Sequence, residues 1–370
     1  MLMGKSTNSN GVFIMSKKRF MSALYLEETD RVPLFDFLFN PELFKKVLGR
    51  FPPSGVTDWV ECTKRLGLDA LWLWADASED FQLKPADEEG SFYDEWGQKC
   101  SVTREEHWPI PWIAGHPLKD IEKLEEYEPP DPFAPGRTKT IEQAVKLADE
   151  DMAILGGVGG PFINAAMLTG FSTYSIVMYE RPSAIHKITE MITHFHTEVG
   201  KRLIDAGVDV IKISEDLGSD ETLFISPKHL RIFGLPYLKR MVDTFKKRGV
   251  PVSLHCDGNI NAVLDDIIKI GIDVLHPIQR KAQMDIAEIK EKYGDKICLM
   301  GNIDATKTLP LGSTEEIINE TRQCISIAAP GGGHILASDH SLTGISLERV
   351  KTMFDVGRKY GKYPVKEVKA

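Results

Sequence analysis

The stretch VPVSLHCDGNI, residues 250–260, decides the fold because it contains a pattern that recurs along the whole chain. An apolar run ends abruptly in polar residues. Near-continuous apolar runs of this length are typical of parallel strands that are buried on both faces. Seven further runs share the pattern: RVPLFDFL (31–38), LDALWLWAD (68–76), MAILGGVGG (152–160), VDVIKISED (208–216), IDVLHPI (272–278), KICLMGNID (296–304) and GHILASDH (333–340).

Amphipathic helix patterns separate these runs. One covers residues 183–207, a second extends from Ser226 to residue 248, and a third at 313–328 opens with a capping-box pattern. Strands and helices that alternate eight times predict an α/β fold, a single (β/α)8 TIM barrel, over residues 17–362. A doubly wound open sheet is the structural alternative.

One stretch, residues 79–135, interrupts this rhythm. It contains Trp96, Trp108 and Trp112 but no clear strand–helix unit. A connection of this length usually has its own structure or acts as a lid, so we interpret it as a hairpin and arm over the barrel mouth after the second strand. Two end segments are expected to be loose: residues 1–16 form a flexible extension, of which 1–14 are dispensable, and 363–370 form a tail.

The composition narrows the class of protein. The 370 residues are 42% apolar and 27% charged, which is typical of a soluble globular enzyme. With 45 basic and 54 acidic residues, the net charge is −9, which argues against nucleic acid or an anionic membrane as the main partner. No apolar run is long enough to span a membrane. Five dispersed cysteines fit a reducing compartment, so we expect a cytoplasmic protein.

In a barrel the active site lies where the carboxyl ends of the strands meet. The polar residues that end the runs are therefore the candidate site residues: Asp36, Asn40, Asp76, Glu215, Asp216, His255, Asp257, Asn259, His276, Gln279, Asn302, Asp304, Asp339, His340 and Ser341. Together they predict one polar mouth, which is more informative than any single residue.

The densest polar group is in LHCDGNI. His255 and Asp257 are two residues apart, so on a strand both point to the same side, where they could bind a divalent metal or act as an acid–base pair. The alternative is that Asp257 belongs to a turn that ends the strand. Cys256 points the other way and is expected to be a buried small residue. For Asp216, a helix cap or a salt bridge is the competing interpretation.

Several motifs, taken in order, resemble the uroporphyrinogen decarboxylase superfamily. They are DRVPLFDF (30–37), HPLKDIEKLEEYEPPDP (116–132), LHCDGNI (254–260), IDVLHPIQ (272–279), LMGNIDATKTLPLGSTEEI (299–317) and GGHILASDHSL (332–342). The resemblance covers residues 17–362 and implies a (β/α)8 barrel, in agreement with the strand pattern.

The resemblance also distinguishes two branches. True uroporphyrinogen decarboxylases carry an arginine-rich motif after the first strand, where arginines pair with substrate carboxylates. Here that position reads FDFLFNPELF (35–44), without arginine. The chain looks more like the corrinoid-dependent methyltransferases. That implies transfer of a methyl group from a small donor, such as a methoxylated aromatic, to the Co(I) of a corrinoid protein, as in anaerobic O-demethylation and one-carbon metabolism.

Three alternatives stay open. The chain could transfer methyl from methylcobamide to a thiol. It could decarboxylate a small or tetrapyrrole acid. It could also be a non-catalytic corrinoid- or tetrapyrrole-binding protein, because a fold does not determine function. The expected partners are a small methylated substrate and a corrinoid protein, and a homodimer is a further expectation.

The resemblance implies specific residues. In the coenzyme M enzymes, zinc is held by His-x-Cys after the fifth strand and by a Cys after the last. His255 matches the histidine, whereas Asp257 and His340 occupy the two cysteine positions. The implied zinc ligands are thus His255, Asp257 and His340, and nitrogen and oxygen ligands suit polarisation of an oxygen. The expected catalytic residues are these three and Glu215, and the expected substrate-binding residues are Asp36, Asn40, Trp74, Asp216, Asn302 and Asp304.

Overall fold

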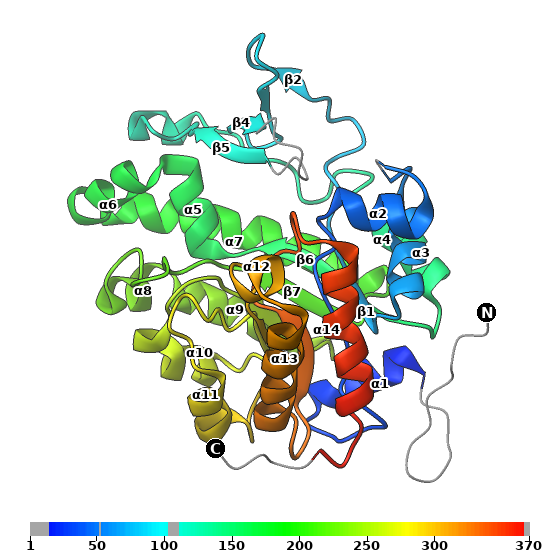
Figure 1. Ribbon diagram of the computed structural model, residues 1–370. Coiled ribbons are helices and arrows are strands. Elements are labelled where there is room, and N and C mark those ends of the chain that lie inside the picture. Colours follow the sequence, from blue (N-terminus) through cyan, green and yellow to red (C-terminus); the bar gives the residue numbers. More distant parts are fainter. Residues whose placement is uncertain (1–14, 52, 103–110, 366–370) are drawn as a thin grey trace.

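A computed structural model describes residues 15–51, 53–102 and 111–365. Its centre is one curled sheet of seven parallel strands in the order β1-β6-β7-β8-β9-β10-β11 (Figure 1). The order follows the sequence without reversal, so the alternative of a doubly wound sheet is wrong. The strands are β1 (Ala70–Trp74), β6 (Ala153–Gly159), β7 (Val210–Ser214), β8 (Val252–His255), β9 (Val274–His276), β10 (Cys298–Ile303) and β11 (His334–Ser338).

The remaining expected strand, residues 31–38, is an extended segment with isolated bridges. Leu34 forms a parallel bridge with Leu336 of β11, and the Phe35 N–H donates to the Leu336 carbonyl at 3.0 Å. On its other side, the Asp69 N–H donates to the Leu34 carbonyl at 2.8 Å, just before β1. The segment therefore lies between the two edges of the sheet, and the fold is TIM-barrel-like.

Helices follow the strands as the sequence predicts, with one difference. The expected helix over residues 226–248 is two helices that meet at Gly234, and the predicted capping box of Ser313 and Glu316 is confirmed at α13. The helices are α1 (Ser16–Leu24), α2 (Pro41–Leu48), α3 (Val56–Leu66), α4 (Lys139–Ala148), α5 (Pro161–Thr169), α6 (Phe171–Glu180), α7 (Pro182–Asp205), α8 (Pro227–Phe233), α9 (Leu235–Lys247), α10 (Leu264–Ile270), α11 (Ile286–Tyr293), α12 (Thr308–Leu311), α13 (Thr314–Ala328) and α14 (Leu347–Tyr360), with 3₁₀ turns η1 (Ile121–Glu125) and η2 (Asn261–Val263).

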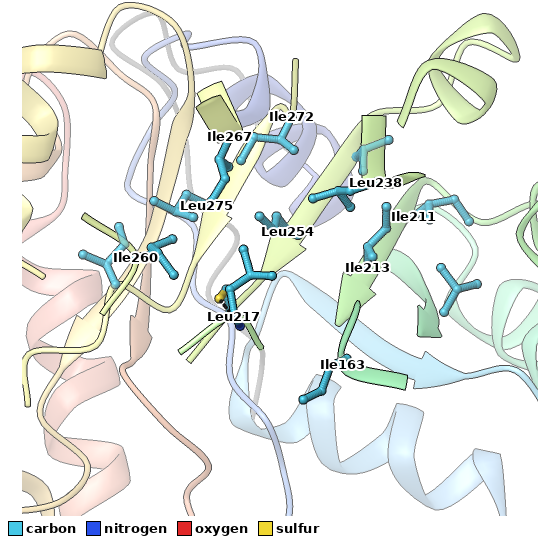
Figure 2. Close-up of a cluster of buried hydrophobic side chains, with 14 of the residues drawn as sticks. Ile163, Ile211, Ile213, Leu217, Leu238, Leu254, Ile260, Ile267, Ile272 and Leu275 are labelled. Atoms are coloured by element: carbon cyan, nitrogen blue, oxygen red, sulfur yellow. Dashed lines mark hydrogen bonds between the residues drawn. The ribbon is translucent and has the colours of Figure 1, made fainter. Parts of the chain in front are cut away.

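Alternate residues of each strand belong to two different apolar clusters. One cluster packs between the sheet and the surrounding helices, where Ile211, Ile213 and Leu254 meet Leu238 of α9 (Figure 2). The other lies inside the curl and contains large rings from the 31–38 segment and β1, and α1 contributes side chains to it as well. A side chain's parity on its strand therefore decides whether it faces the helices or the interior.

The expected insertion contains a four-stranded antiparallel sheet, which lies at the top of Figure 1 beside α5 and α6. Its strands are β2 (Lys84–Pro85), β3 (Phe92–Tyr93), β4 (Lys99–Val102) and β5 (Pro111–Gly115). The Trp96 ring packs on Phe195 of α7 at 4.7 Å between ring centres, and the Leu118 N–H donates to the Leu168 carbonyl of α5. The role of this insertion as a lid stays a prediction, and Trp108 lies outside the described residues.

The ends of the chain differ in part from the expectation. Residues 1–14 and 366–370 lie outside the described residues. Ser16, which the sequence assigned to the flexible extension, already begins α1. In the expected tail, the Tyr363 N–H donates to the Asp30 carbonyl at 3.3 Å.

Candidate functional site

Three residues predicted from separate parts of the chain come together at the carboxyl end of the sheet. His255 is the last residue of β8, Asp257 follows it, and His340 follows β11. The Asp257 Oδ2 atom lies 3.8 Å from His255 Nε2 and 3.7 Å from His340 Nε2. Asp257 therefore lies between two imidazoles, and because β8 ends at His255 it lies in the loop after the strand rather than on it.

Asp216, which sequence analysis placed with the substrate-binding residues, lies in the same group. One ligand atom from each of Asp216, His255 and Asp257 lies within 4.8 Å of the other two. The Asp257 N–H donates to Asp216 Oδ1 at 3.0 Å, which fixes the two carboxylates relative to each other. The imidazole of His340 is farther out, with 47% of its side chain exposed.

A second histidine orients the first. The Nδ1 atoms of His255 and His276, the last residue of β9, are 2.8 Å apart, so one must donate and the other accept. Burial, and then the nearby Lys212 amine, lower the pKa of His255 well below its usual value, which keeps the ring neutral. Where His255 donates from Nδ1 to His276, its neutral ring keeps the Nε2 lone pair free for a metal, and such a hydrogen bond behind the ring is the usual support for a histidine ligand.

Asp257 has an uncompensated polar atom. Its Oδ1 is buried and accepts no hydrogen bond among the described residues. Burial, and then the charge of Asp216, raise the pKa of Asp257 to about 7. A buried carboxylate oxygen without a partner is costly, and two neighbouring carboxyl groups add repulsion. A cation between them would relieve both costs.

Sequence analysis did not commit to Lys212 of β7 as a site residue. Its Nζ atom is buried, has no hydrogen-bond partner among the described residues, and lies 4.4 Å from the Phe37 ring centre and 4.9 Å from that of Trp72. Ser253, its register partner on β8, also has a buried hydroxyl, and this hydroxyl finds no hydrogen-bond partner in the described part of the chain. The signal was present: a lysine inside the apolar run VDVIKISED has the strand parity of Val210, which faces the interior.

Two of the expected substrate-binding residues are engaged in contacts that close the fold. The carboxylate of Asp36 accepts hydrogen bonds from the hydroxyl and the N–H of Ser338, and from the Phe37 N–H. Asn40 caps α2, and its amide donates to the carbonyls of Leu342 and Ile345. These contacts do not support a role in substrate binding, which stays a prediction for both.

Glu215, Asn302 and Asp304 also lie outside the grouped ligand atoms. The two oxygens of Glu215 accept the first free N–H groups of α5, from Phe162 and Ile163. The Asn302 amide donates to the Ile278 carbonyl, and Asp304 Oδ1 accepts from the turn that follows it. The catalytic role of Glu215 stays a prediction that these contacts do not support.

Trp74 occupies a different place. It ends β1, is 46% exposed, and lines a cavity of about 240 Å³ between the ends of β1 and β6 and the inserted sheet. Its ring packs edge-on against Trp72, with centres 4.9 Å apart. Trp74 is therefore the expected substrate-binding residue that faces an open space.

A family comparison agrees with this geometry. The model of the family "Uroporphyrinogen decarboxylase (URO-D)" matches residues 96–360, well over half of the chain. The chain belongs to this family. The URO-D family match includes β6 to β11 and therefore Asp216, His255, Asp257 and His340.

Curated relatives of this URO-D chain carry two kinds of name. The uroporphyrinogen decarboxylase of Anaeromyxobacter dehalogenans is 28% identical over 222 residues, which are 58% of this chain and 60% of that protein. The methylcobamide:CoM methyltransferase MtbA of Methanosarcina acetivorans is 25% identical over 245 residues, which are 63% of this chain and 69% of that protein. The chain thus spans about 60% of the length of the first relative.

A solved structure shares the fold. A methyltransferase from Methanosarcina mazei matches with a TM-score of 0.71 and 22% identity, and the match covers 94% of this chain and 99% of that one. In the part of the chain that the structure describes, no helix has the length and apolar character needed to cross a membrane.

Proposed function

We propose that this URO-D family member transfers a methyl group from a small methylated donor, such as a methoxylated aromatic, to the Co(I) of a corrinoid protein. The observation that carries the proposal is the group of Asp216, His255 and Asp257 at the carboxyl end of the sheet. Similarity to methylcobamide methyltransferases supports the same class of reaction.

The charge of the mouth favours this reaction over decarboxylation of a polycarboxylate. Asp216 and Asp257 are neighbours after β7 and β8, and Asp339, buried at the end of β11, is near enough for its charge to raise the pKa of Asp257. Arg19 and Arg31 are bound to Asp69, at the start of β1 and so at the opposite end of the sheet. A substrate with several carboxylates would meet like charge, whereas a cation would be attracted.

The residues present fit a zinc ion. Two ligands about 2 Å from a tetrahedral zinc lie about 3.3 Å apart, close to the 3.8 Å between His255 Nε2 and Asp257 Oδ2. His255, Asp257 and Asp216 would hold it, with His340 near enough to join. A zinc ion there supplies Lewis-acid polarisation of the oxygen that carries the methyl group.

The chain's own residues would prepare the donor for transfer. The reaction is R–O–CH3 plus Co(I) and a proton giving R–OH and methyl-cobalt, so the leaving oxygen must receive a proton. His340 is half exposed and lies beside Asp257, which suits it to carry that proton from solvent. The rings of Phe37 and Trp72, which belong to the interior apolar cluster, would exclude water from a methyl group held beside them.

Metal analysis of the purified protein tests this proposal. We expect one zinc per chain in the wild type and less than about a tenth of that in His255→Ala, because loss of one of three ligands weakens binding by orders of magnitude. His194→Ala changes an exposed histidine on α7 and should keep its zinc. An equal metal content in wild type and His255→Ala would refute the site.

A methyl-transfer assay tests the reaction itself. A methoxylated aromatic with cob(I)alamin on a corrinoid protein should give methylcobamide much faster than the same donor with free cob(I)alamin. Equal rates would contradict the need for a protein partner. Release of CO2 from a carboxylated substrate, without any methyl transfer, would assign the chain to the decarboxylase reaction.

A further inference from the structure

The cavity beside Trp74 combines aromatic rings with acidic side chains. It has a volume of about 240 Å³, and the described residues that line it do not include Asp216, His255 or Asp257. Apolar cavities of about 150 Å³ bind benzene, so this one has room for a small organic ligand. The rings in the lining are those of Trp74, Phe81, Trp96 and Phe195, and the carboxylates are those of Asp76, Asp94 and Glu95.

Trp74 is held in a fixed place but stays accessible to a ligand. A Cβ atom on Gly157 of β6 would lie 2.6 Å from Trp72 Nε1 and 3.1 Å from Trp74 Cε3, so glycine is needed for both rings to lie against this strand. Trp74 is nevertheless 46% exposed, and Phe81 is half-buried. These two side chains therefore offer ring surface that a molecule in the cavity can reach.

The carboxylates leave the lining with uncompensated negative charge. Glu95 is paired with Arg137, whose Nη2 lies 2.7 Å from Glu95 Oε1. Asp76 and Asp94 form no ion pair within the described part of the chain, and burial raises the pKa of the Asp94 carboxyl group. His196 adds no charge, because burial lowers its pKa to about 3. The cavity is therefore suited to a cation and would repel an anion.

The hydrogen bonds of these carboxylates favour one kind of cation. Asp76 accepts from the hydroxyl and the N–H of Thr140, one on each oxygen. Asp94 accepts from the N–H and the side-chain amide of Gln98, again one on each oxygen. A primary ammonium or a guanidinium would have to share these oxygens, and any N–H left unpaired would weaken its binding. A quaternary ammonium has no N–H group, so it needs only the charge and the rings.

Aromatic rings attract cations to their faces, and recognition of quaternary ammonium ligands is the best-known use of this attraction. We propose that the cavity beside Trp74 binds a free quaternary ammonium cation such as choline, with its methyl groups against the rings of Trp74 and Phe81 and its charge balanced by Asp76 and Asp94. The binding does not depend on the proposed function, because the cation is held whole and is not the methyl donor.

Calorimetric titration of the full-length protein with choline tests this site, without corrinoid protein or methyl donor. Trp74→Leu keeps an apolar side chain but removes the ring, and should weaken choline binding about tenfold, whereas Trp74→Phe should recover part of the affinity. The matched control is Trp112→Leu, at an exposed tryptophan of β5 outside the lining, which should bind as the wild type does. Asp94→Asn removes one charge and should also weaken binding about tenfold. Its control is Asp80→Asn, at an exposed position outside the lining.

Ligand analogues separate the charge of the ligand from its shape. In 3,3-dimethyl-1-butanol a carbon replaces the nitrogen of choline, and this neutral analogue should bind the wild type about tenfold more weakly or worse. Phosphocholine, the headgroup of choline lipids, adds an anionic group and should be weakened as much, which distinguishes a free cation from a lipid headgroup. Equal binding of choline and either analogue would overturn the proposal, as would wild-type affinity in Trp74→Leu with an unchanged unfolding midpoint. Failure of choline to bind at millimolar concentration would do the same. Because neither zinc nor methyl transfer is measured, these outcomes are independent of the tests of the proposed function.

Discussion

Asp257 joins parts of the chain that are far apart in sequence. Its Oδ2 lies between the imidazoles of His255 and His340, and its backbone N–H holds Asp216. An acidic residue at this position could have been a simple turn former, as the alternative interpretation of the sequence held. A turn former does not need a buried carboxylate oxygen such as Oδ1, for which the described residues provide no hydrogen-bond donor.

At the same scale, the buried amine of Lys212, which has no hydrogen-bond partner among the described residues, is expected to lower the stability of the fold. Burying an amine without a hydrogen-bond partner costs about 1–3 kcal/mol. Lys212→Met keeps the length of the side chain and removes that cost, so we expect the free energy of unfolding to rise by about 1–3 kcal/mol while methyl transfer falls. Urea denaturation and the transfer assay measure the two effects.

Lys247→Met, at an exposed position of α9, is the matched control and should change neither quantity. A loss of stability in Lys212→Met would mean that the amine has a favourable partner, and the argument for a functional lysine would then be wrong. Full methyl-transfer activity in a Lys212→Met variant that is more stable than the wild type would equally contradict the argument for a functional lysine.

At the scale of the elements, the contact between the 31–38 segment and β11 depends on the protonation state of Asp36. Burial raises the pKa of Asp36 to about 7 despite hydrogen bonds from Ser338 and Phe37, whereas in the unfolded chain it is about 3.9. Between these values the folded state binds the extra proton. The stability that Asp36 contributes is thus complete below about pH 4 and is lost as the pH rises through 7.

Asp36→Asn tests this linkage because its side chain does not titrate. The free energy of unfolding of the wild type, minus that of the variant, should decrease between pH 5 and pH 8. Urea denaturation at four pH values in that range provides the measurement. A constant difference would mean that Asp36 has the same pKa in both states.

The sequence predicted the elements well because their signals are local. An apolar run followed by polar residues identifies a strand and its carboxyl end, which is why the sequence could place His255, Asp257 and His340 at the same end of the sheet. The contact of His276 with His255 depends on the register between β8 and β9, which no local pattern contains. The break at Gly234 and the irregular pairing of residues 31–38 likewise result from tertiary packing rather than from the hydrophobic period.

For the whole molecule, the insertion is expected to depend on the barrel for its structure. Its strands are two to five residues long, and Trp96 finds its packing partners on α7. A peptide of residues 79–135 should therefore be unfolded by circular dichroism. Limited proteolysis of the full chain should release no stable piece from this region. Recovery of a folded fragment would show an independent domain.

The closure of the sheet has a consequence for how the chain is made on the ribosome. Ser338 donates to Asp36, and the two residues are 302 positions apart. At roughly 5–20 residues per second, synthesis leaves the apolar segment around Phe35 and Phe37 without its partner strand for about 15–60 seconds. During that interval the aromatic segment around Phe35 and Phe37 has left the ribosome but has no partner strand, and it remains unpaired for longer than the strands that follow it. The nascent chain is then a natural client for holding chaperones, and slower translation of the last third would lengthen its exposure.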